Sequence, residues 1–242
     1  MNEYRIRPVP LTKVKIDKSV MTYLMNFGKI IEIGTYLWVI EGGKEKIIVD
    51  TGCSAEVQRK GGFLAEQIMG LDEGLRSVGL RPEDVDIVIL THLHWDHCAY
   101  AKRFVNARFI VQKKELNAAL SPHPAIKNVY NKEFIEGLNL ETVDGEAEIT
   151  DGVSVFLTPG HTPGGQSVSV ETSKGRAVIT GFCCIRENFE PPPELRDMFE
   201  VIMPGIHIDM LKLYDSMMEI KKRADFIIPL HDIQYLHEKE IP

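Results

Sequence analysis

Four side chains that can bind a metal ion stand within six residues, in the run His92-Leu93-His94-Trp95-Asp96-His97. Imidazole nitrogen and carboxylate oxygen are ligands suited to zinc, iron or manganese. His92 and His94 are two residues apart on a segment that leaves a predicted strand, so both side chains can point to one side. A chain with only eight histidines would seldom place three of them this close together by chance. The run therefore predicts a metal centre.

Three apolar segments of the chain each lead into a histidine. Residues 85–90 lead to His92, residues 153–157 lead to His161, and residues 226–230 lead to His231. Such runs are typical of strands buried on both faces. Because α/β proteins tend to build their sites at the carboxyl ends of strands, we expect the three histidines to converge.

The other predicted elements alternate strand and helix in two rounds. They are strands at 35–40 and 46–50 around a turn at Gly42-Gly43, a helix over 63–80, a strand at 108–112 with a helix up to 120, a short helix at 132–138, strands at 166–171 and 176–180, and a helix over 209–223. This order predicts the α/β fold class.

Taken together and in this order, several motifs resemble the metallo-β-lactamase superfamily. They are the HxHxDH run at 92–97, Val-Asp-Thr-Gly at 49–52, Thr-Pro-Gly-His-Thr at 158–162, Val-Ile-Thr-Gly at 178–181 and Pro-Leu-His at 229–231. The resemblance implies a four-layer αβ/βα sandwich, and we expect one domain over residues 1–242. Residues 161–167 and 187–189 are most similar to the N-acyl homoserine lactonase group within that superfamily.

The resemblance also implies the metal ligands. One metal would be held by His92, His94 and His161, and a second by Asp96, His97 and His231. Asp50 would orient a ligand histidine through a hydrogen bond. We expect two zinc ions per chain, with iron or manganese as alternatives.

One position departs from the family pattern. Phe182 stands where the family has an aspartate that bridges the two metals. Cys183 is expected to replace that ligand, with Cys184 as the alternative. Only one of the two can reach the site, because neighbouring residues of a strand face opposite ways. Two other possibilities remain open, a bridge made by hydroxide alone and a centre with a single metal.

The expected reaction is attack of a metal-bound hydroxide on a lactone or a related ester, with Asp96 passing a proton to the leaving oxygen. His207 is a candidate for substrate binding. One alternative is thioester hydrolysis of the glyoxalase II kind, although the segment after Pro229 is too short to supply the C-terminal helical part with which that family binds glutathione. Another is a non-catalytic metal-binding or ligand-sensing protein. Iron-based reduction of oxygen or nitric oxide with a flavin partner is disfavoured, because proteins of that kind usually have a glutamate at the position of His94.

Composition excludes several other classes of function. The net charge of −7 and the absence of a long Lys/Arg run weigh against nucleic acid as a partner. The sequence has no apolar stretch long enough for a membrane span or a signal peptide, so we expect a cytoplasmic protein with no membrane partner. The irregular spacing of the four cysteines fits a reducing compartment. A homodimer is possible.

Overall fold

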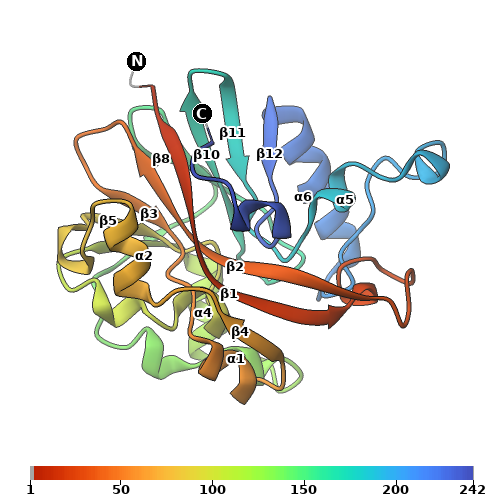
Figure 1. The fold of residues 1–242 in the computed structure, drawn as a ribbon, viewed down its shortest axis with the longest axis horizontal. Helices are drawn as coiled ribbons and strands as arrows, with labels where there is room; N and C mark the ends of the chain where they lie inside the picture. Colours follow the sequence, from red (N-terminus) through yellow and green to blue (C-terminus); the bar gives the residue numbers. More distant parts are fainter. Residues whose placement is uncertain (1–2, 242) are drawn as a thin grey trace.

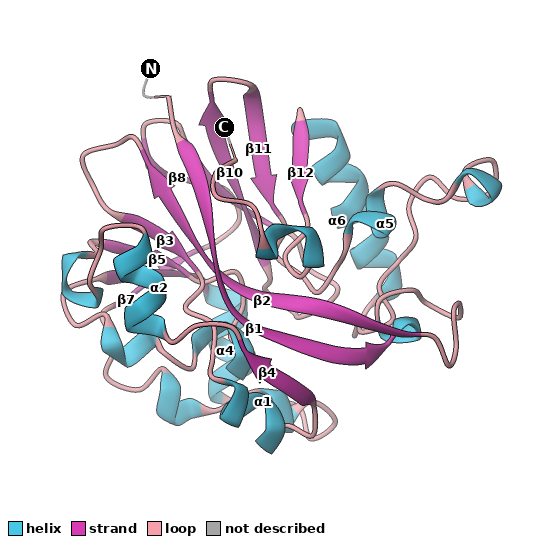
Figure 2. Ribbon diagram, in the orientation of Figure 1, coloured by secondary structure: helices cyan, strands magenta, loops and turns pink. Residues whose placement is uncertain are grey.

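The structure is a computed structural model that describes residues 3–241. Two β-sheets pack face to face, and helices cover the outer face of each sheet (Figure 1). Figure 2 shows the same layers by type of secondary structure. The order of layers is helix, sheet, sheet, helix, which confirms the predicted four-layer αβ/βα sandwich.

The first sheet has seven strands and mixes antiparallel with parallel pairing. Across the sheet, the order is β4 (Leu64–Gln67), β1 (Arg5–Asp17), β2 (Ile30–Glu41), β3 (Ile47–Val49), β5 (Ile87–Ile89), β6 (Arg108–Gln112) and β7 (Leu140–Val143). From β3 to β7 the pairing is parallel, so these strands end at the same edge.

The second sheet has five strands. Their order is β12 (Phe226–Ile228), β11 (Gly175–Ile179), β10 (Gln166–Thr172), β9 (Val153–Leu157) and β8 (Ala147–Thr150). Strands β11 and β12 run parallel, and the other pairs are antiparallel.

Helices and short 3-10 turns connect the strands. The α-helices are α1 (Ala55–Lys60), α2 (Leu71–Ser77), α3 (Trp95–Cys98), α4 (Lys113–Leu120), α5 (Arg186–Phe189) and α6 (Met210–Arg223). The 3-10 helices are η1 (Lys18–Val20), η2 (Pro82–Asp84), η3 (Ala101–Arg103), η4 (Lys127–Val129), η5 (Lys132–Phe134), η6 (Pro193–Leu195) and η7 (Ile233–Leu236). Every helix within residues 3–241 is too short or too polar to cross a membrane.

The apolar run before His92 is buried on both faces, as its composition predicts. Ile87 and Ile89 point into the cluster between the two sheets, whereas Val88 and Leu90 point into the cluster beneath the helices that cover the first sheet. Successive side chains of a strand face opposite ways, so a strand between two apolar layers has no polar position. The same packing anchors the segment that carries the histidines.

The helix predicted over residues 63–80 is wrong in its first half. Residues 64–67 form β4, which pairs with β1 at the edge of the sheet, and the helix begins only at Leu71 after Gly70. Leu64, which fits the helical spacing, is 76% exposed. Pairing with β1 satisfies backbone N–H and C=O groups of residues 64–67, and the local hydrophobic periodicity does not reveal this tertiary contact. The short helix predicted at 132–138 is a 3-10 turn over Lys132–Phe134.

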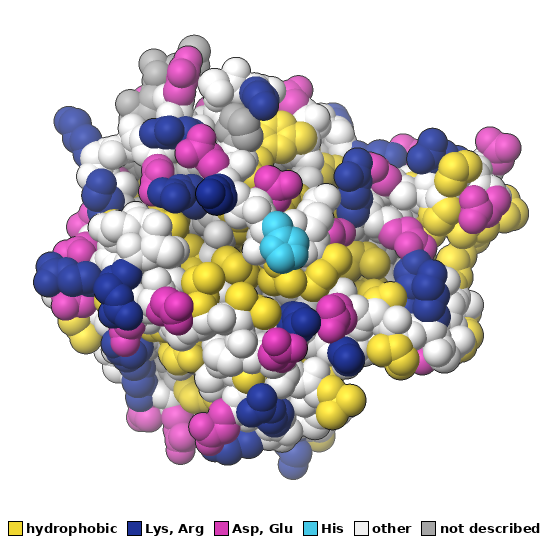
Figure 3. Space-filling model, viewed as in Figure 1, with side chains coloured by type: hydrophobic (Ala, Val, Ile, Leu, Met, Phe, Trp, Pro, Cys, Tyr) yellow, Lys and Arg dark blue, Asp and Glu magenta, His cyan; other side chains and the backbone are white. Residues whose placement is uncertain are grey.

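On the face of the molecule in Figure 3, basic and acidic side chains are interspersed. The sequence has 28 basic and 35 acidic side chains. A nucleic-acid surface typically gathers basic residues into one patch or stripe. This face has no such gathering.

Candidate metal centre

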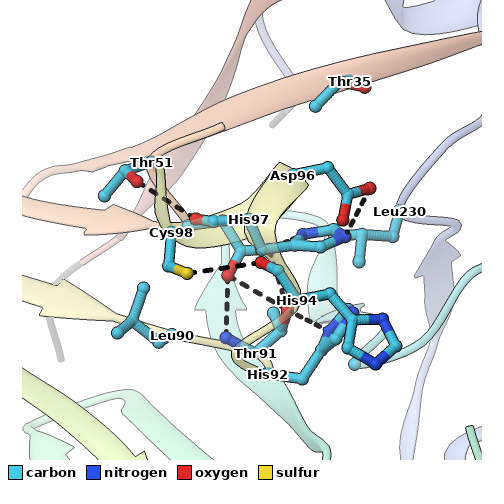
Figure 4. Close-up of polar contacts among 12 residues, drawn as sticks. Thr35, Thr51, Leu90, Thr91, His92, His94, Asp96, His97, Cys98 and Leu230 are labelled. Carbon is cyan, nitrogen blue, oxygen red and sulfur yellow. Dashed lines mark hydrogen bonds and ion pairs between the residues drawn. The ribbon is translucent and has the colours of Figure 1, made fainter. Parts of the chain in front are cut away.

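The run from His92 to His97 bends from a strand into a short helix. His92 is fully buried just beyond β5, and His94 is the N-cap of α3, which contains Asp96 and His97. Leu93 and Cys98 face the apolar cluster beneath the helices. Because these two residues are drawn into the core, the ligand-type side chains between them are left to face the opposite side, where Figure 4 shows them gathered.

His161 and His231 reach the same place from the second sheet. His161 lies in the loop after β9, and its Nδ1 is 2.9 Å from the carbonyl oxygen of Ile206. His231 follows β12, and its Nδ1 is 2.8 Å from the carbonyl oxygen of Gly34. A carbonyl oxygen only accepts, so each Nδ1 carries the proton and donates. The Nε2 lone pairs are therefore free to bind a metal.

Gly160 lets the His161 loop approach helix α6 closely. Its φ of +126° is one that residues with side chains rarely adopt, and a Cβ there would lie 2.4 Å from the backbone nitrogen of Leu213. The backbone N–H groups of Ile208 and Asp209 donate to the Gly160 carbonyl oxygen. These bonds hold His161 against the segment that leads into α6.

The ligand-type side chains form two groups of three. His92, His94 and His161 make up the first triad, and Asp96, His97 and His231 make up the second triad. Within each triad, one potential ligand atom per residue lies within 4.8 Å of the others. The ring centroids of His92 and His97 are 4.0 Å apart, so the two triads adjoin. The grouping is the one that the predicted two-metal centre requires.

Electrostatics keep most of these imidazoles neutral. Burial lowers the pKa of His161 and of His231 to about 4, and it holds the pKa values of His92 and His94 well below the usual range. A neutral imidazole offers the lone pair that a metal needs.

His97 differs from the other histidines because it lies between two carboxylates. Burial alone would lower its pKa, but Asp96 and Asp50 raise the pKa of His97 to about 10. Its Nε2 lies 3.4 Å from Asp96 Oδ2, the contact drawn in Figure 4. The second triad therefore favours a positive charge at this point.

The donor set fits divalent metal ions. His92 Nε2 is buried and has no hydrogen-bond partner among residues 3–241. A buried polar atom without a partner costs free energy, and a bound metal would supply that partner. A triad of three histidines, like the first, and a triad of two histidines with one carboxylate, like the second, are both typical of sites for zinc and related divalent metals.

Asp50 is the buried carboxylate that holds the second triad in place. It follows β3 at a φ of +56°, a conformation that Asp and Asn tolerate better than most residues. Its Oδ2 lies 2.7 Å from His97 Nδ1, and its Oδ1 accepts from the backbone N–H of Thr91 at 2.8 Å. The predicted orienting contact is thus present, and it links β3 to the segment carrying the candidate ligands.

Asp50→Asn tests this contact. In the unmodified protein, each carboxylate oxygen of Asp50 faces a hydrogen-bond donor. The asparagine amide group would instead place a donor opposite the donor at His97 Nδ1 or at Thr91 N. We expect metal affinity at the second triad to fall about 10- to 100-fold, measured by elemental analysis after dialysis. Asp72→Asn, which alters only an exposed ion pair with Arg103, is the control. Unchanged metal content in Asp50→Asn would contradict the role.

The comparison with known protein families agrees with this geometry. The family model described as the metallo-beta-lactamase superfamily matches residues 31–222, which is most of the chain. The chain belongs to the metallo-beta-lactamase superfamily. His231 lies beyond the matched residues, so its place in this superfamily member's site rests on the structure.

Its relatives within the superfamily point to one branch. The chain is 29% identical over 241 residues to an N-acyl homoserine lactonase of Bacillus thuringiensis, covering 93% of this chain and 92% of the relative. A lactonase of a Bacillus species is 30% identical over 196 residues, covering 75% of this chain and 77% of that protein.

Solved structures give the same picture. A Bacillus thuringiensis protein with N-decanoyl-L-homoserine at its active site matches with a TM-score of 0.79 and 28% identity, over 97% of this chain and 95% of the other. An N-acyl homoserine lactone hydrolase with its product N-hexanoyl-L-homoserine at the catalytic metal centre matches equally well, with a TM-score of 0.79 and 29% identity, over the same shares of each chain.

Phe182 shows where this superfamily member departs from the family pattern. Its side chain is fully buried and belongs to the apolar cluster between the second sheet and α6. Its ring centroid is 6.2 Å from that of Phe189. Position 182 therefore contributes to the core and supplies no ligand to either triad.

The two cysteines after Phe182 face opposite ways. Cys184 joins Phe182 in the cluster beside α6, while Cys183 lines the pocket at the metal centre. Cys183 Sγ lies 3.6 Å from the sulfur of Met21, and it belongs to neither triad. Burial raises the pKa of the Cys183 thiol well above its usual value. The structure thus separates the cysteines as predicted, and ligation by Cys183 stays a prediction.

Apolar side chains form the wall of this pocket. They include Val14, Ile16, Val20, Ile33, Phe63, Val129 and Ile206. Thr35 and Gln58 add a polar pair, with Gln58 Nε2 donating to Thr35 Oγ1 at 3.1 Å. His207 is not part of the lining, because its Nδ1 lies 2.9 Å from the Pro204 carbonyl oxygen and its ring packs edge-on against Tyr23. Its neighbour Ile206 lines the pocket instead.

Sequence reasoning missed several residues of the site. Strand β1, which supplies Val14 and Ile16, carries no histidine or motif that would draw attention to it. Its alternation of apolar and charged residues from Lys13 to Asp17 is the signal that could have found it. Glu115, a fully buried residue of α4 that accepts hydrogen bonds from the backbone beside the first triad, was also missed, because a lone glutamate in a helix usually faces solvent.

Proposed function

We propose that this protein is a metal-dependent hydrolase that opens the ring of an N-acyl homoserine lactone or a closely related lactone. The observation that carries the proposal is the pair of adjoining triads at the base of an apolar pocket. Lactonases similar to this chain over nearly its whole length support the choice of substrate. The apolar wall suits the hydrocarbon part of such a substrate.

Two zinc ions are the proposed cofactor, with iron or manganese as alternatives. His92, His94 and His161 would hold one ion, and Asp96, His97 and His231 the other. When bound, the metals would polarise the lactone carbonyl and provide a nucleophile from water near neutral pH. Whether Cys183 adds a ligand is settled by the metal–sulfur distance in a loaded crystal.

The protein's own residues orient the imidazole rings and transfer protons. The Nδ1–H groups of His161 and His231 donate to backbone carbonyl oxygens, which fixes both rings without using Nε2. Asp96 has two carboxylate oxygens and needs only one for the triad, so the other can carry a proton to the ring oxygen that leaves. A bond forms between the water oxygen and the carbonyl carbon, and the ring C–O bond breaks. The product is a hydroxy acid.

Purification without added metal, followed by elemental analysis and a substrate panel, tests the proposal. The panel holds N-acyl homoserine lactones of different chain lengths, a simple lactone, an open-chain ester and a thioester. We expect two metals per chain and the highest kcat/KM on acyl lactones. Preference for the thioester would favour the glyoxalase II kind of reaction. A metal-loaded protein that is silent on the whole panel would favour a ligand-sensing role.

Removal of metal should cost both activity and stability. At a metal concentration 100 times Kd, each site stabilises the fold by about 2.7 kcal/mol. For a protein of this size, the loss of one site therefore lowers Tm by roughly 5–10 °C. We expect EDTA to abolish turnover and lower Tm, and Zn²⁺ to restore both. Mg²⁺ is the control because it prefers oxygen ligands. Full recovery with Mg²⁺ would contradict nitrogen-rich metal sites.

A further inference from the structure

A glutamate with no exposed surface lies beneath the first triad. Glu115 stands in the first turn of α4 and is 0% exposed. A buried carboxylate is costly unless hydrogen bonds compensate for its lost hydration. Nothing in the reaction above uses this side chain, so its retention in the core needs another explanation.

Three donors surround the Glu115 carboxylate. Oε1 accepts from the backbone N–H of Leu93 at 3.0 Å and from the hydroxyl of Tyr130 at 3.2 Å. Oε2 accepts from the backbone N–H of Gly164 at 3.1 Å. Each oxygen is thus bound to a different loop of the metal centre. The donors match an ionised carboxylate, which can accept at both oxygens.

The two loops carry all the ligands of the first triad. Leu93 stands between His92 and His94 in the chain, and Gly164 stands three residues after His161. The loops come from different sheets, since one follows β5 and the other follows β9. Glu115 is therefore a single group that binds the backbone of both loops.

The contact depends on close approach of the second loop. A Cβ at Gly164 would lie 2.2 Å from the backbone nitrogen of Glu115, so this position has room only for glycine. The Tyr130 ring in turn packs edge-on against His94, with centroids 5.2 Å apart. Glu115 thus contacts the first triad's surroundings from three directions without touching a ligand side chain.

We infer that Glu115 is a positioning residue that sets the spacing of His92, His94 and His161 by tying their two loops together. The second triad has its own buried carboxylate in Asp50, which contacts His97 directly. Glu115 differs because it acts through backbone N–H groups. The inference rests on the proposed metal function, since it assigns the purpose of the spacing to metal binding.

Cobalt titration of the full-length chain tests this role. His231→Ala removes a member of the second triad, so in that parent Co²⁺ binding reports on the first triad. Glu115→Gln in the same parent keeps the shape of the side chain, but its amide N–H group would face the backbone N–H of one of the two loops. We expect about 10- to 100-fold weaker Co²⁺ affinity and an altered visible absorption spectrum. Glu115→Asp, which shortens the side chain by one methylene, should weaken binding as well and serves if Glu115→Gln does not fold.

Val170→Ala is the control for general destabilisation. Val170 is 0% exposed in the cluster between the two sheets, where it pairs with Val153 and Ala177, and it lies outside both ligand loops. We expect this change to lower Tm while leaving Co²⁺ affinity and spectrum unchanged. Equal loss of affinity in the control and in Glu115→Gln would mean that general destabilisation explains the effect, and would overturn the inference. Parent-like affinity in both Glu115 variants would also overturn it.

Failure of the proposed metal site is distinguishable from failure of the inference. If the parent binds no Co²⁺ at the first triad, the metal function itself is wrong and the inference falls with it. If the parent binds Co²⁺ and the Glu115 variants bind it equally well, only the positioning role is wrong.

Discussion

We expect His94→Ala and His97→Ala each to abolish hydrolysis and to release metal. His94 belongs to the first triad and His97 to the second, so each change leaves one metal with two protein donors. Loss of His97 also leaves Asp50 and Asp96 facing a gap without the group that separates their charges. Removing one partner of a buried pair costs about 3–5 kcal/mol, so His97→Ala should be the less stable variant. Elemental analysis, a lactone assay and thermal unfolding measure the three effects.

His123→Ala is the matched control for these variants. His123 is exposed and lies outside both triads. We expect its metal content, turnover and Tm to equal those of the unmodified protein. Near-normal activity in both His94→Ala and His97→Ala would contradict the metal-dependent mechanism. Full metal content with no turnover in the unmodified protein would support the non-catalytic alternative.

The second large effect is expected at Phe182. Phe182→Asp introduces the side chain of the family pattern, yet the backbone directs position 182 into the cluster beside α6. Deleting a buried phenylalanine side chain costs about 3–5 kcal/mol, and the effective cost of burying an unpaired carboxylate is several kcal/mol more. Their sum is comparable to the whole stability of a typical domain, about 5–15 kcal/mol. We therefore expect Phe182→Asp to unfold the protein, as measured by circular dichroism and chemical denaturation.

Phe182→Leu separates packing from charge. It keeps position 182 apolar and should cost on the order of 1–2 kcal/mol, with metal content unchanged. A stable Phe182→Asp protein with tighter metal binding would show that position 182 can reach the metals, contrary to the structure. The bridging role of the family's aspartate would then be recoverable in this chain by one substitution.

These expectations describe a variant metal centre. Each triad has three potential donors from the protein. Position 182, where the family has the bridging carboxylate, is occupied by a phenylalanine that packs in the core. Cys183 faces the pocket from the next position, close to Met21. The two triads adjoin at His92 and His97. Separate metal affinities for the two triads would be the direct sign of this arrangement.

Local sequence alone was sufficient for the candidate ligands and for most of the strands around them. The HxHxDH run concentrates ligands so strongly that its chemistry follows from residue types. The segments before His92, His161 and His231 are predominantly apolar, as is typical of strands that lie between two buried layers. Helix α6 is likewise visible in its spacing, its Asp209 cap and its basic last turn.

Tertiary structure decided the features that depend on contacts between distant segments. Residues 64–67 have helical spacing but form β4, because the edge of β1 offers backbone partners that a helix does not need. Which of Phe182, Cys183 and Cys184 faces the metals depends on how the chain leaves β11, and their residue types do not reveal it. The roles of Asp50 and Glu115 arise from loops that meet only in the fold. Residue type and spacing determine which groups can bind a metal, whereas the packing of the two sheets determines which of them meet, since neither sheet contains a complete centre by itself.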